Sequence, residues 1–157
     1  MKLERRTVRY ETLQDLVNEA RQLAERGYSR AGEWSLGQVC NHLAGAINMS
    51  RDGFPSGLPR PMRPIMRLVL FGRMRKRIPI RLRVPTLPSL QPPADIADEE
   101  AIDRLSAAIA RFNEPGATFA ASPVLGKLTA EEWNVFHLWH SEHHMSFLLP
   151  SDVAATV

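Results

Sequence analysis

The histidines are the residues best suited to chemistry, and they are unevenly placed along the chain. The chain holds five histidines: one is His42, and four fall within HLWHSEHH, residues 137–144. His140 and His144 are four residues apart, so on an α-helix their imidazoles lie on one side, within reach of a single ion at roughly 2.0–2.1 Å. The spacing therefore indicates a two-histidine chelate, whose third ligand must come from another part of the chain.

The helical phase of this segment predicts that its imidazoles face the core. Because each residue of an α-helix advances by about 100°, Trp133 and Phe136 fall within about 40° of His140. A buried imidazole is costly unless its donor and its acceptor both find partners, and a metal ion can satisfy several imidazoles at once. A hydrogen-bonded core residue is the ordinary alternative for an isolated histidine. The conjunction of motifs nevertheless predicts a divalent metal ion held by His42, His140 and His144.

Two further histidines, His137 and His143, crowd the same face. Either could replace a ligand, hydrogen-bond to one, transfer a proton or reach solvent. We name both as candidate catalytic residues, on the ground of nearness alone. Cys40 lies two residues, or about 200°, from His42 and should face away from the site. We therefore expect Cys40 to be a small buried apolar residue and not a nucleophile.

Apolar periodicity and capping residues predict the elements that position these side chains. Thr12 and Ser35 are expected N-caps, and the sequence Thr-Ala-Glu-Glu from Thr129 is a capping box, in which hydroxyl and carboxylate satisfy each other's backbone amides. Acidic residues open a further helix, as suits the positive end of its dipole. The expected helices run from Thr12 to Gly27, over residues 35–50, 65–77 and 97–112, and from Thr129 to before Pro150.

The same pattern predicts the fold class. Prolines and glycines interrupt residues 53–64 and 78–95, and no segment shows a convincing strand pattern. We therefore expect an all-α protein, an antiparallel bundle of four or five helices with a long, basic, proline-rich crossover over residues 53–96. A single domain spanning residues 1–157 suits this length.

Charge is concentrated in one segment. The chain has 20 Lys and Arg against 17 Asp and Glu, yet no acidic residue lies between Asp52 and Asp95, while residues 60–83 hold nine basic ones. These cations could bind an anionic small-molecule substrate at the mouth of the site, lie on an anionic membrane surface or on nucleic acid, or form a solvated surface. Phe71 is the only aromatic residue in the segment, which disfavours base stacking.

The single cysteine and the charged N-terminal sequence favour a reducing compartment. The one cysteine cannot form an internal disulfide, and the N-terminus carries charges where the apolar core of a secretory signal would lie. No stretch approaches the roughly 20 apolar residues that span a bilayer. We therefore expect a cytoplasmic protein without a transmembrane segment.

Two motifs resemble a known family. The segment WSLGQVCNHLAGAI, residues 34–47, resembles the second-helix signature of the DinB/YfiT-like superfamily, and HSEHHMSFL, residues 140–148, is similar to its last-helix motif. The approach to the last helix resembles an uncharacterised-domain branch of that superfamily. The resemblance implies an up-and-down four-helix bundle, a three-histidine site for zinc or nickel, and a homodimer. The run Met145-Ser146-Phe147 departs from the arginine- and glutamine-bearing continuation of typical members, which have no basic crossover either.

Characterised relatives in that superfamily include thiol-dependent S-transferases, so the resemblance implies a low-molecular-weight thiol as cosubstrate. Three histidine ligands leave a metal ion with open positions, an arrangement typical of catalytic sites. The expected function is therefore that of a metal-dependent enzyme, a thiol S-transferase or a hydrolase, acting on a small molecule. The alternative is a non-catalytic binding module that uses residues 60–83 on an anionic membrane surface or on nucleic acid.

Overall fold

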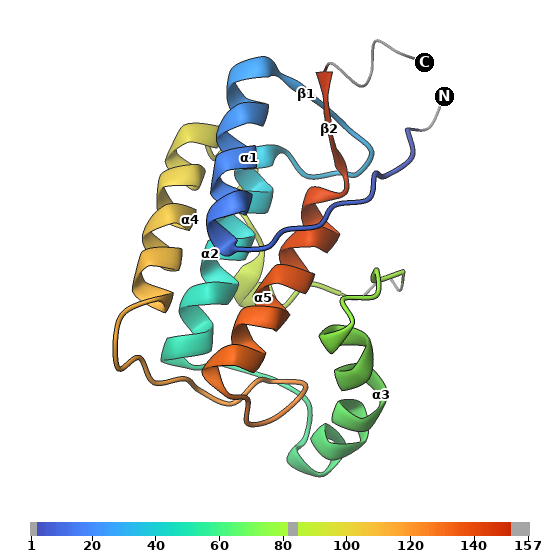
Figure 1. Cartoon of the computed structure of the whole chain (residues 1–157), viewed down its shortest axis with the longest axis vertical. Helices are drawn as coiled ribbons and strands as arrows, with labels where there is room; N and C mark the ends of the chain where they lie inside the picture. Colours follow the sequence, from blue (N-terminus) through green and yellow to red (C-terminus); the bar gives the residue numbers. More distant parts are fainter. Residues whose placement is uncertain (1–2, 82–84, 152–157) are drawn as a thin grey trace.

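The computed structural model describes residues 3–81 and 85–151, and this part of the chain contains five α-helices and a two-stranded antiparallel sheet. Four helices pack side by side, and α3 stands beside α5 on the side away from α4 (Figure 1). None of the described helices has the length and apolar character needed to cross a membrane. The helices are α1 (Leu13–Arg26), α2 (Leu36–Asp52), α3 (Arg63–Arg75), α4 (Asp98–Phe112) and α5 (Ala130–Met145).

Capping boxes fix the starts of α1, α2 and α5. In each, the N-cap hydroxyl accepts a hydrogen bond from the backbone amide three residues on, and the side chain of that residue accepts one from the N-cap amide. The helix starts expected at Thr12, Ser35 and Thr129 are therefore confirmed. The pairs are Thr12 with Asp15, Ser35 with Gln38, and Thr129 with Glu132.

The core lies between α1, α2, α4 and α5. The apolar stripes of these helices meet there, and the residues at their centre are buried completely. The indole nitrogen of Trp133 reaches the carbonyl of Ala120 at 3.2 Å, so this large side chain is buried without an unpaired donor. Side chains with no exposed surface include Leu16, Leu36, Ile102, Leu105 and Trp133.

A glycine brings α2 close to the start of α4. A Cβ built on Gly37 would lie 2.7 Å from the carbonyl oxygen of Ile96, closer than real Cβ contacts come. The amide of Gly37 donates a hydrogen bond of 2.7 Å to Oδ1 of Asp98, so the first turn of α4 caps the N-terminus of α2. This crossing fixes where α2 begins, and with it the depth at which His42 lies.

The sheet was not expected from the sequence. Strand β1 (Tyr28–Arg30) pairs with β2 (Leu148–Pro150), with Ser29 opposite Leu149. Each strand has three residues, too few for an alternating pattern to be recognised, and the partners are more than a hundred residues apart. The pairing ties the chain after α1 to the chain after α5.

The crossover is more structured than a connecting loop, and the fold-class prediction is wrong. It contains α3, the 3-10 turns η1 (Arg60–Met62) and η2 (Pro88–Leu90), and extended chain between them. Five helices and a sheet therefore replace the predicted all-α, up-and-down four-helix bundle in the described chain. The helix expected over residues 65–77 is present as α3. The fold class was misjudged because α3 is a fifth helix outside the four-helix bundle and because the three-residue strands depend on contacts made in space.

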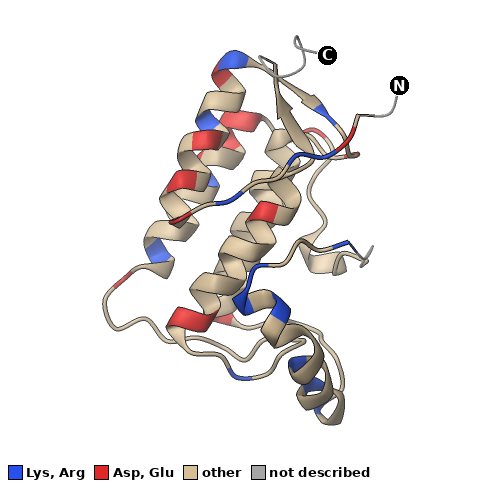
Figure 2. Ribbon diagram, turned by 45° about the vertical axis from the view of Figure 1, so that its right-hand side comes forward, with Lys and Arg blue, Asp and Glu red and all other residues tan. Residues whose placement is uncertain are grey.

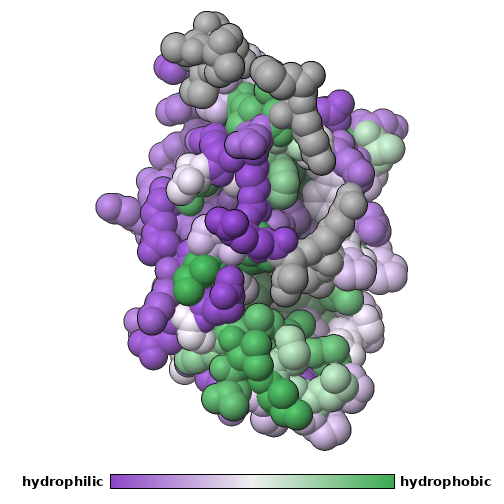
Figure 3. All heavy atoms as spheres, turned by 90° about the vertical axis from the view of Figure 1, so that its right-hand side faces the viewer, coloured by the Kyte–Doolittle hydropathy of each residue, from purple (hydrophilic) through white to green (hydrophobic). Residues whose placement is uncertain are grey.

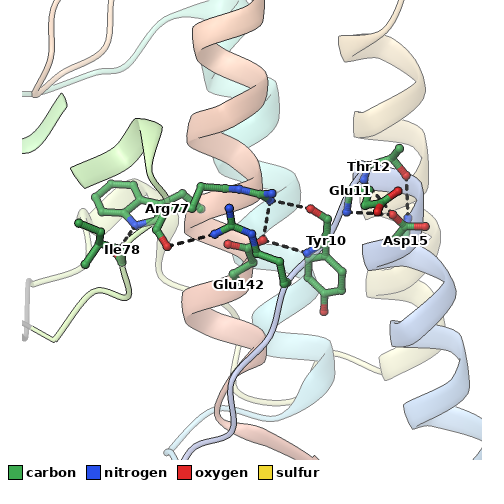
Figure 4. Close-up of polar contacts among 9 residues, drawn as sticks. Tyr10, Glu11, Thr12, Asp15, Arg77, Ile78 and Glu142 are labelled. Atoms are coloured by element: carbon green, nitrogen blue, oxygen red, sulfur yellow. Dashed lines mark hydrogen bonds and ion pairs between the residues drawn. The ribbon is translucent and has the colours of Figure 1, made fainter. Parts of the chain in front are cut away.

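A buried ion pair anchors the end of α3 to α5. Nη1 of Arg77 donates to Oε1 of Glu142 at 2.7 Å and to the carbonyl of Tyr10 at 2.6 Å, and the amide of Tyr10 donates to the same carboxylate oxygen at 2.9 Å (Figure 4). Burial raises the pKa of Glu142, and Arg77 and the Tyr10 amide oppose that shift. Next to this pair, the indole nitrogen of Trp139 donates to the carbonyl of Ile78 at 2.7 Å. The N-terminal segment, α5 and the crossover thus meet at one point.

Candidate metal centre

Three imidazoles from two helices converge on one point. Nε2 of His140 lies 3.2 Å from Nε2 of His42 and 3.1 Å from Nε2 of His144. Tetrahedral ligation at 2.0–2.1 Å places ligand atoms about 3.3 Å apart, so these distances approach those of a ligand set. Among the described residues, this is the group of histidine, cysteine and carboxylate side chains that is placed to hold an ion.

The proline-rich connector fixes the orientation of His42. Its Nδ1 lies 3.0 Å from the carbonyl oxygen of Leu90 in η2. Because a carbonyl only accepts hydrogen bonds, Nδ1 carries the proton and Nε2 presents its lone pair to the other two rings. This is the arrangement by which backbone groups around metal sites set the tautomer of a histidine ligand. A Cβ built on Gly45 would lie 3.0 Å from Cδ2 of Leu90, so Gly45 makes room for this contact.

Hydrogen bonding alone does not satisfy the cluster. A proton on Nε2 of His140 could serve only one of its two neighbours well. With that proton on Nδ1 instead, Nε2 of His140 could accept from His144 but would still face the lone pair of His42. Nδ1 of His140 is buried and has no hydrogen-bond partner among the described residues. A cation at the centre would be contacted by all three lone pairs, so the donor set fits a divalent metal ion.

The electrostatic surroundings keep these rings neutral. Burial lowers the pKa of His42 and, together with the other histidines, takes the pKa values of His140 and His144 well below their usual range. Neutral imidazoles are the form that binds metal ions. At pH 7 the cluster therefore presents lone pairs and carries no charge of its own.

Aromatic rings enclose the cluster. Trp34 stacks on His144 with ring centroids 5.4 Å apart and packs against His42 at 5.0 Å. On the other side, Phe136 lies 5.7 Å from His140. The sequence marked Trp34 only as the residue before a helix cap, so its place in the site was not predicted. Its signal was present: it directly precedes the cap of the helix that carries His42.

An open pocket of about 1100 Å³ adjoins the cluster. His144 belongs both to the cluster and to the pocket wall, so an ion held there would lie beside the pocket. His143 also lines it, and Nη1 of Arg5 lies 3.5 Å from Nδ1 of His143. Burial, with a smaller contribution from Arg5, lowers the pKa of His143 to about 4. Other lining residues are Trp34, Ile80, Arg81 and Phe147.

His137 lies in a different environment. It is 1 % exposed, its ring stacks on Trp133 at 5.3 Å, and its Nε2 lies 3.0 Å from Oγ of Ser50. Burial lowers its pKa to about 3. It lines neither described pocket, so of the two candidate catalytic histidines only His143 is placed beside the possible substrate site.

Cys40 is fully buried in the core, and burial raises the pKa of its thiol to about 12. That environment suits an inert thiol.

The basic segment divides into internal and exposed cations. Arg67 bonds to the carbonyls of Leu125 and Lys127, and Arg77 bonds to Glu142. Arg81 lines the pocket, while Arg83 lies outside the described residues. Within the described part of the segment, the exposed basic residues are Arg60, Arg73, Arg75, Lys76 and Arg81.

Comparison with known proteins revises the assignment made from the motifs. No curated protein and no solved structure matches the chain. The family described as "Protein of unknown function (DUF1569)" matches residues 2–151, and the DinB/YfiT-like assignment is wrong because the match is to this different family. The two histidine motifs, residues 34–47 and 140–148, cover 23 of the 157 residues, whereas the family match covers nearly the whole chain. Since the match covers nearly its whole length, the chain belongs to the DUF1569 family.

Proposed function

We propose that the protein binds one divalent metal ion through Nε2 of His42, His140 and His144, and that it is a metal-dependent hydrolase for a small molecule. The observation that carries the proposal is the approach of three neutral imidazole nitrogens at the edge of an open pocket. A thiol cosubstrate was implied only by the superfamily resemblance, which does not hold. Hydrolysis needs no second substrate besides water.

The metal ligands, His143 and two aromatic residues have distinct roles in this proposal. An ion held by three imidazoles keeps at least one position open and supplies Lewis-acid activation of water or of a substrate group. His143 is neutral at pH 7, as a general base must be before it accepts a proton. Trp34 and Phe147 form apolar walls that exclude water from the bound substrate.

The cations of the pocket indicate the charge of the substrate. Arg5 and Arg81 line it with one carboxylate, Glu33, so cations outnumber acids there, and guanidinium groups bind carboxylates and phosphates through paired hydrogen bonds. Arg5 is held in place by a 2.8 Å hydrogen bond from its Nη1 to the carbonyl of Ile80. A small substrate that carries a carboxylate or a phosphate therefore suits the pocket best.

Metal analysis tests the first half of the proposal. Protein purified without chelator should contain about one divalent ion per chain, and cobalt substitution should give the visible absorption of a low-coordinate site. His42→Ala and His140→Ala should each lose the ion, whereas His137→Gln should keep it. Wild-type protein that neither retains nor takes up an ion would overturn the proposal.

Activity measurements test the second half. Hydrolysis of 4-nitrophenyl acetate and of bis(4-nitrophenyl) phosphate should require the ion and should fall by roughly 10²–10⁴-fold in His143→Gln, the range typical of a lost general base. Metal content should stay at one ion per chain in that variant. Equal rates of hydrolysis with and without the ion, for both esters, would show that the protein is not a metal-dependent hydrolase, even if it binds the ion.

A further inference from the structure

One face of α3 exposes large apolar side chains to solvent. Leu68 is 87 % exposed, Ile65 63 %, Val69 58 % and Met62 47 %. Among the described residues, the only other large apolar side chains with comparable exposure are Leu3 and Ile78. In Figure 3, which faces the side of the molecule that carries α3, apolar surface covers the lower end.

This exposure does not result from a loosely attached helix. On the opposite face of α3, Met74 is fully buried and Arg67 lies 4.3 Å above the ring of Phe71. Arg67 also donates to the carbonyl of Lys127 at 2.9 Å, and it pairs with Glu132 at 3.4 Å. The inner face of α3 therefore fixes which face points outward.

Positive charge adjoins the apolar face. By helical phase Arg73, Arg75 and Lys76 fall within about 80° of Ile65, on the outward side of the last turn and the residue after it. All three are exposed, and none makes an ion pair with another described residue, although Arg75 lies 5.9 Å from the ring of Phe71. The chain has no acidic residue from 53 to 94, so nothing on α3 offsets these charges (Figure 2).

We propose that the outward face of α3 docks the protein on the surface of an anionic lipid bilayer. Apolar residues flanked by Lys and Arg on one helix face match the boundary between acyl chains and anionic headgroups. The cations would meet lipid phosphates while Ile65, Leu68 and Val69 enter the acyl boundary. The helix lies on the bilayer and does not span it.

Two other occupants fit this face less well. Nucleic acid would gain little from exposed aliphatic side chains, and Phe71 already stacks with Arg67. A second copy of the chain would bring a face that has cations and no carboxylate against an identical one, which gives no charge complementarity. An anionic bilayer matches both the apolar and the basic part of the face.

Vesicle co-sedimentation of the full chain tests this proposal. We expect binding to vesicles of phosphatidylcholine with phosphatidylglycerol and little binding to phosphatidylcholine alone. Replacing Arg73, Arg75 and Lys76 with Gln should lower the apparent affinity roughly a hundredfold, since each cation near an anionic surface contributes about a fivefold factor. Leu68→Glu combined with Val69→Glu should abolish binding. Chelator should change none of these results, because the metal centre takes no part.

Matched controls decide between surface docking and general charge attraction. Arg21, Arg30 and Arg104 lie on α1, β1 and α4, and their replacement with Gln removes the same net charge, although Arg21 and Arg104 are ion-paired with carboxylates. That variant should bind like the wild type, and equal losses in both triple variants would overturn the proposal. It would also fail if sedimentation velocity without lipid showed a dimer that Leu68→Glu with Val69→Glu dissociates. Circular dichroism should confirm that all variants fold.

Discussion

His137 and His140 lie one turn apart on α5, both beside aromatic rings and both with pKa values lowered by burial. Nδ1 of each is buried without a hydrogen-bond partner among the described residues, yet their Nε2 atoms meet different surroundings. Nε2 of His137 is paired with the hydroxyl of Ser50. Nε2 of His140 meets only other imidazoles. The comparison shows that helical phase decides which histidines are buried, whereas the facing helix decides whether a buried histidine is a core residue or a candidate ligand.

Metal binding should separate the two positions most strongly. At a free zinc concentration a thousandfold above the dissociation constant, an ion bound only by the folded state adds about 4 kcal/mol to the free energy of unfolding. Calorimetry should show this as a rise in Tm of roughly 10 °C for the wild type. His137→Leu should retain the rise, and His140→Leu should lose it. A rise that persists in His140→Leu would remove the distinction between the two sites.

Without metal, the stability of the two leucine variants should differ in the opposite sense, with His140→Leu the more stable one. In chelator, His140→Leu should be about 1–2 kcal/mol more stable than the wild type, because it removes buried polar atoms that have too few partners. His137→Leu should gain less, because it removes one unpartnered atom, Nδ1, but also the hydrogen bond from Nε2 to Ser50, whose hydroxyl keeps its bond to the carbonyl of Ile47. Denaturation by urea in excess chelator measures both differences, and a destabilised His140→Leu would show that the cluster is satisfied without an ion.

Truncation of His137 should produce the largest loss of stability among the core changes. His137→Ala empties a site between Trp133 and Phe112 and should lower the free energy of unfolding by about 3 kcal/mol. Ser50→Ala should lower it by about 1–3 kcal/mol, because Nε2 of the buried ring then has no acceptor. Metal content should stay at one ion per chain in both variants, and its loss would place His137 in the metal centre.

The histidines also predict how stability depends on pH. The pKa of His137 is about 3 in the folded protein and about 6.5 when unfolded, so the unfolded state binds more protons between these values. The stabilising contribution is complete above pH 6.5 and is lost as pH falls toward 3. In chelator, His137→Leu should flatten the fall of stability between pH 6 and 4 by about 1.4 kcal/mol per pH unit. An unchanged slope in urea denaturation would contradict the lowered pKa.

The local parts of the site could be predicted from the sequence. Capping boxes at Thr12, Ser35 and Thr129 set the helix starts, and the four-residue spacing placed His140 and His144 on one face. The approach of His140 and His144 to His42 could also be predicted, because the inward faces of packed helices must meet. What these residues bind remains a proposal.

The parts that depend on distant contacts could not be predicted. The Leu90 carbonyl that orients His42 is a backbone group, and no residue type marks it. The separation of His137 from the other rings depends on which residue of α2 it faces, and the sequence does not specify Ser50. The strands and the packing of α3 have the same character, so the fold class was misjudged where the contacts are long-range.

The smallest expected effect tests how the connector holds the site. Gly45 and Gly72 are both helical, but a Cβ at Gly45 meets Leu90 at 3.0 Å and one at Gly72 meets nothing within 4 Å. Gly72→Ala should raise the free energy of unfolding by about 0.5–1 kcal/mol, the usual gain in helix propensity. Gly45→Ala should gain less, because Cδ2 of Leu90 must move by a few tenths of an ångström, and it should weaken zinc affinity, up to about tenfold, as far as this movement displaces the Leu90 carbonyl that orients His42. Zinc titration and urea denaturation of the two variants measure the difference. Equal zinc affinities would show that the hydrogen bond to Leu90 has no part in setting the metal centre.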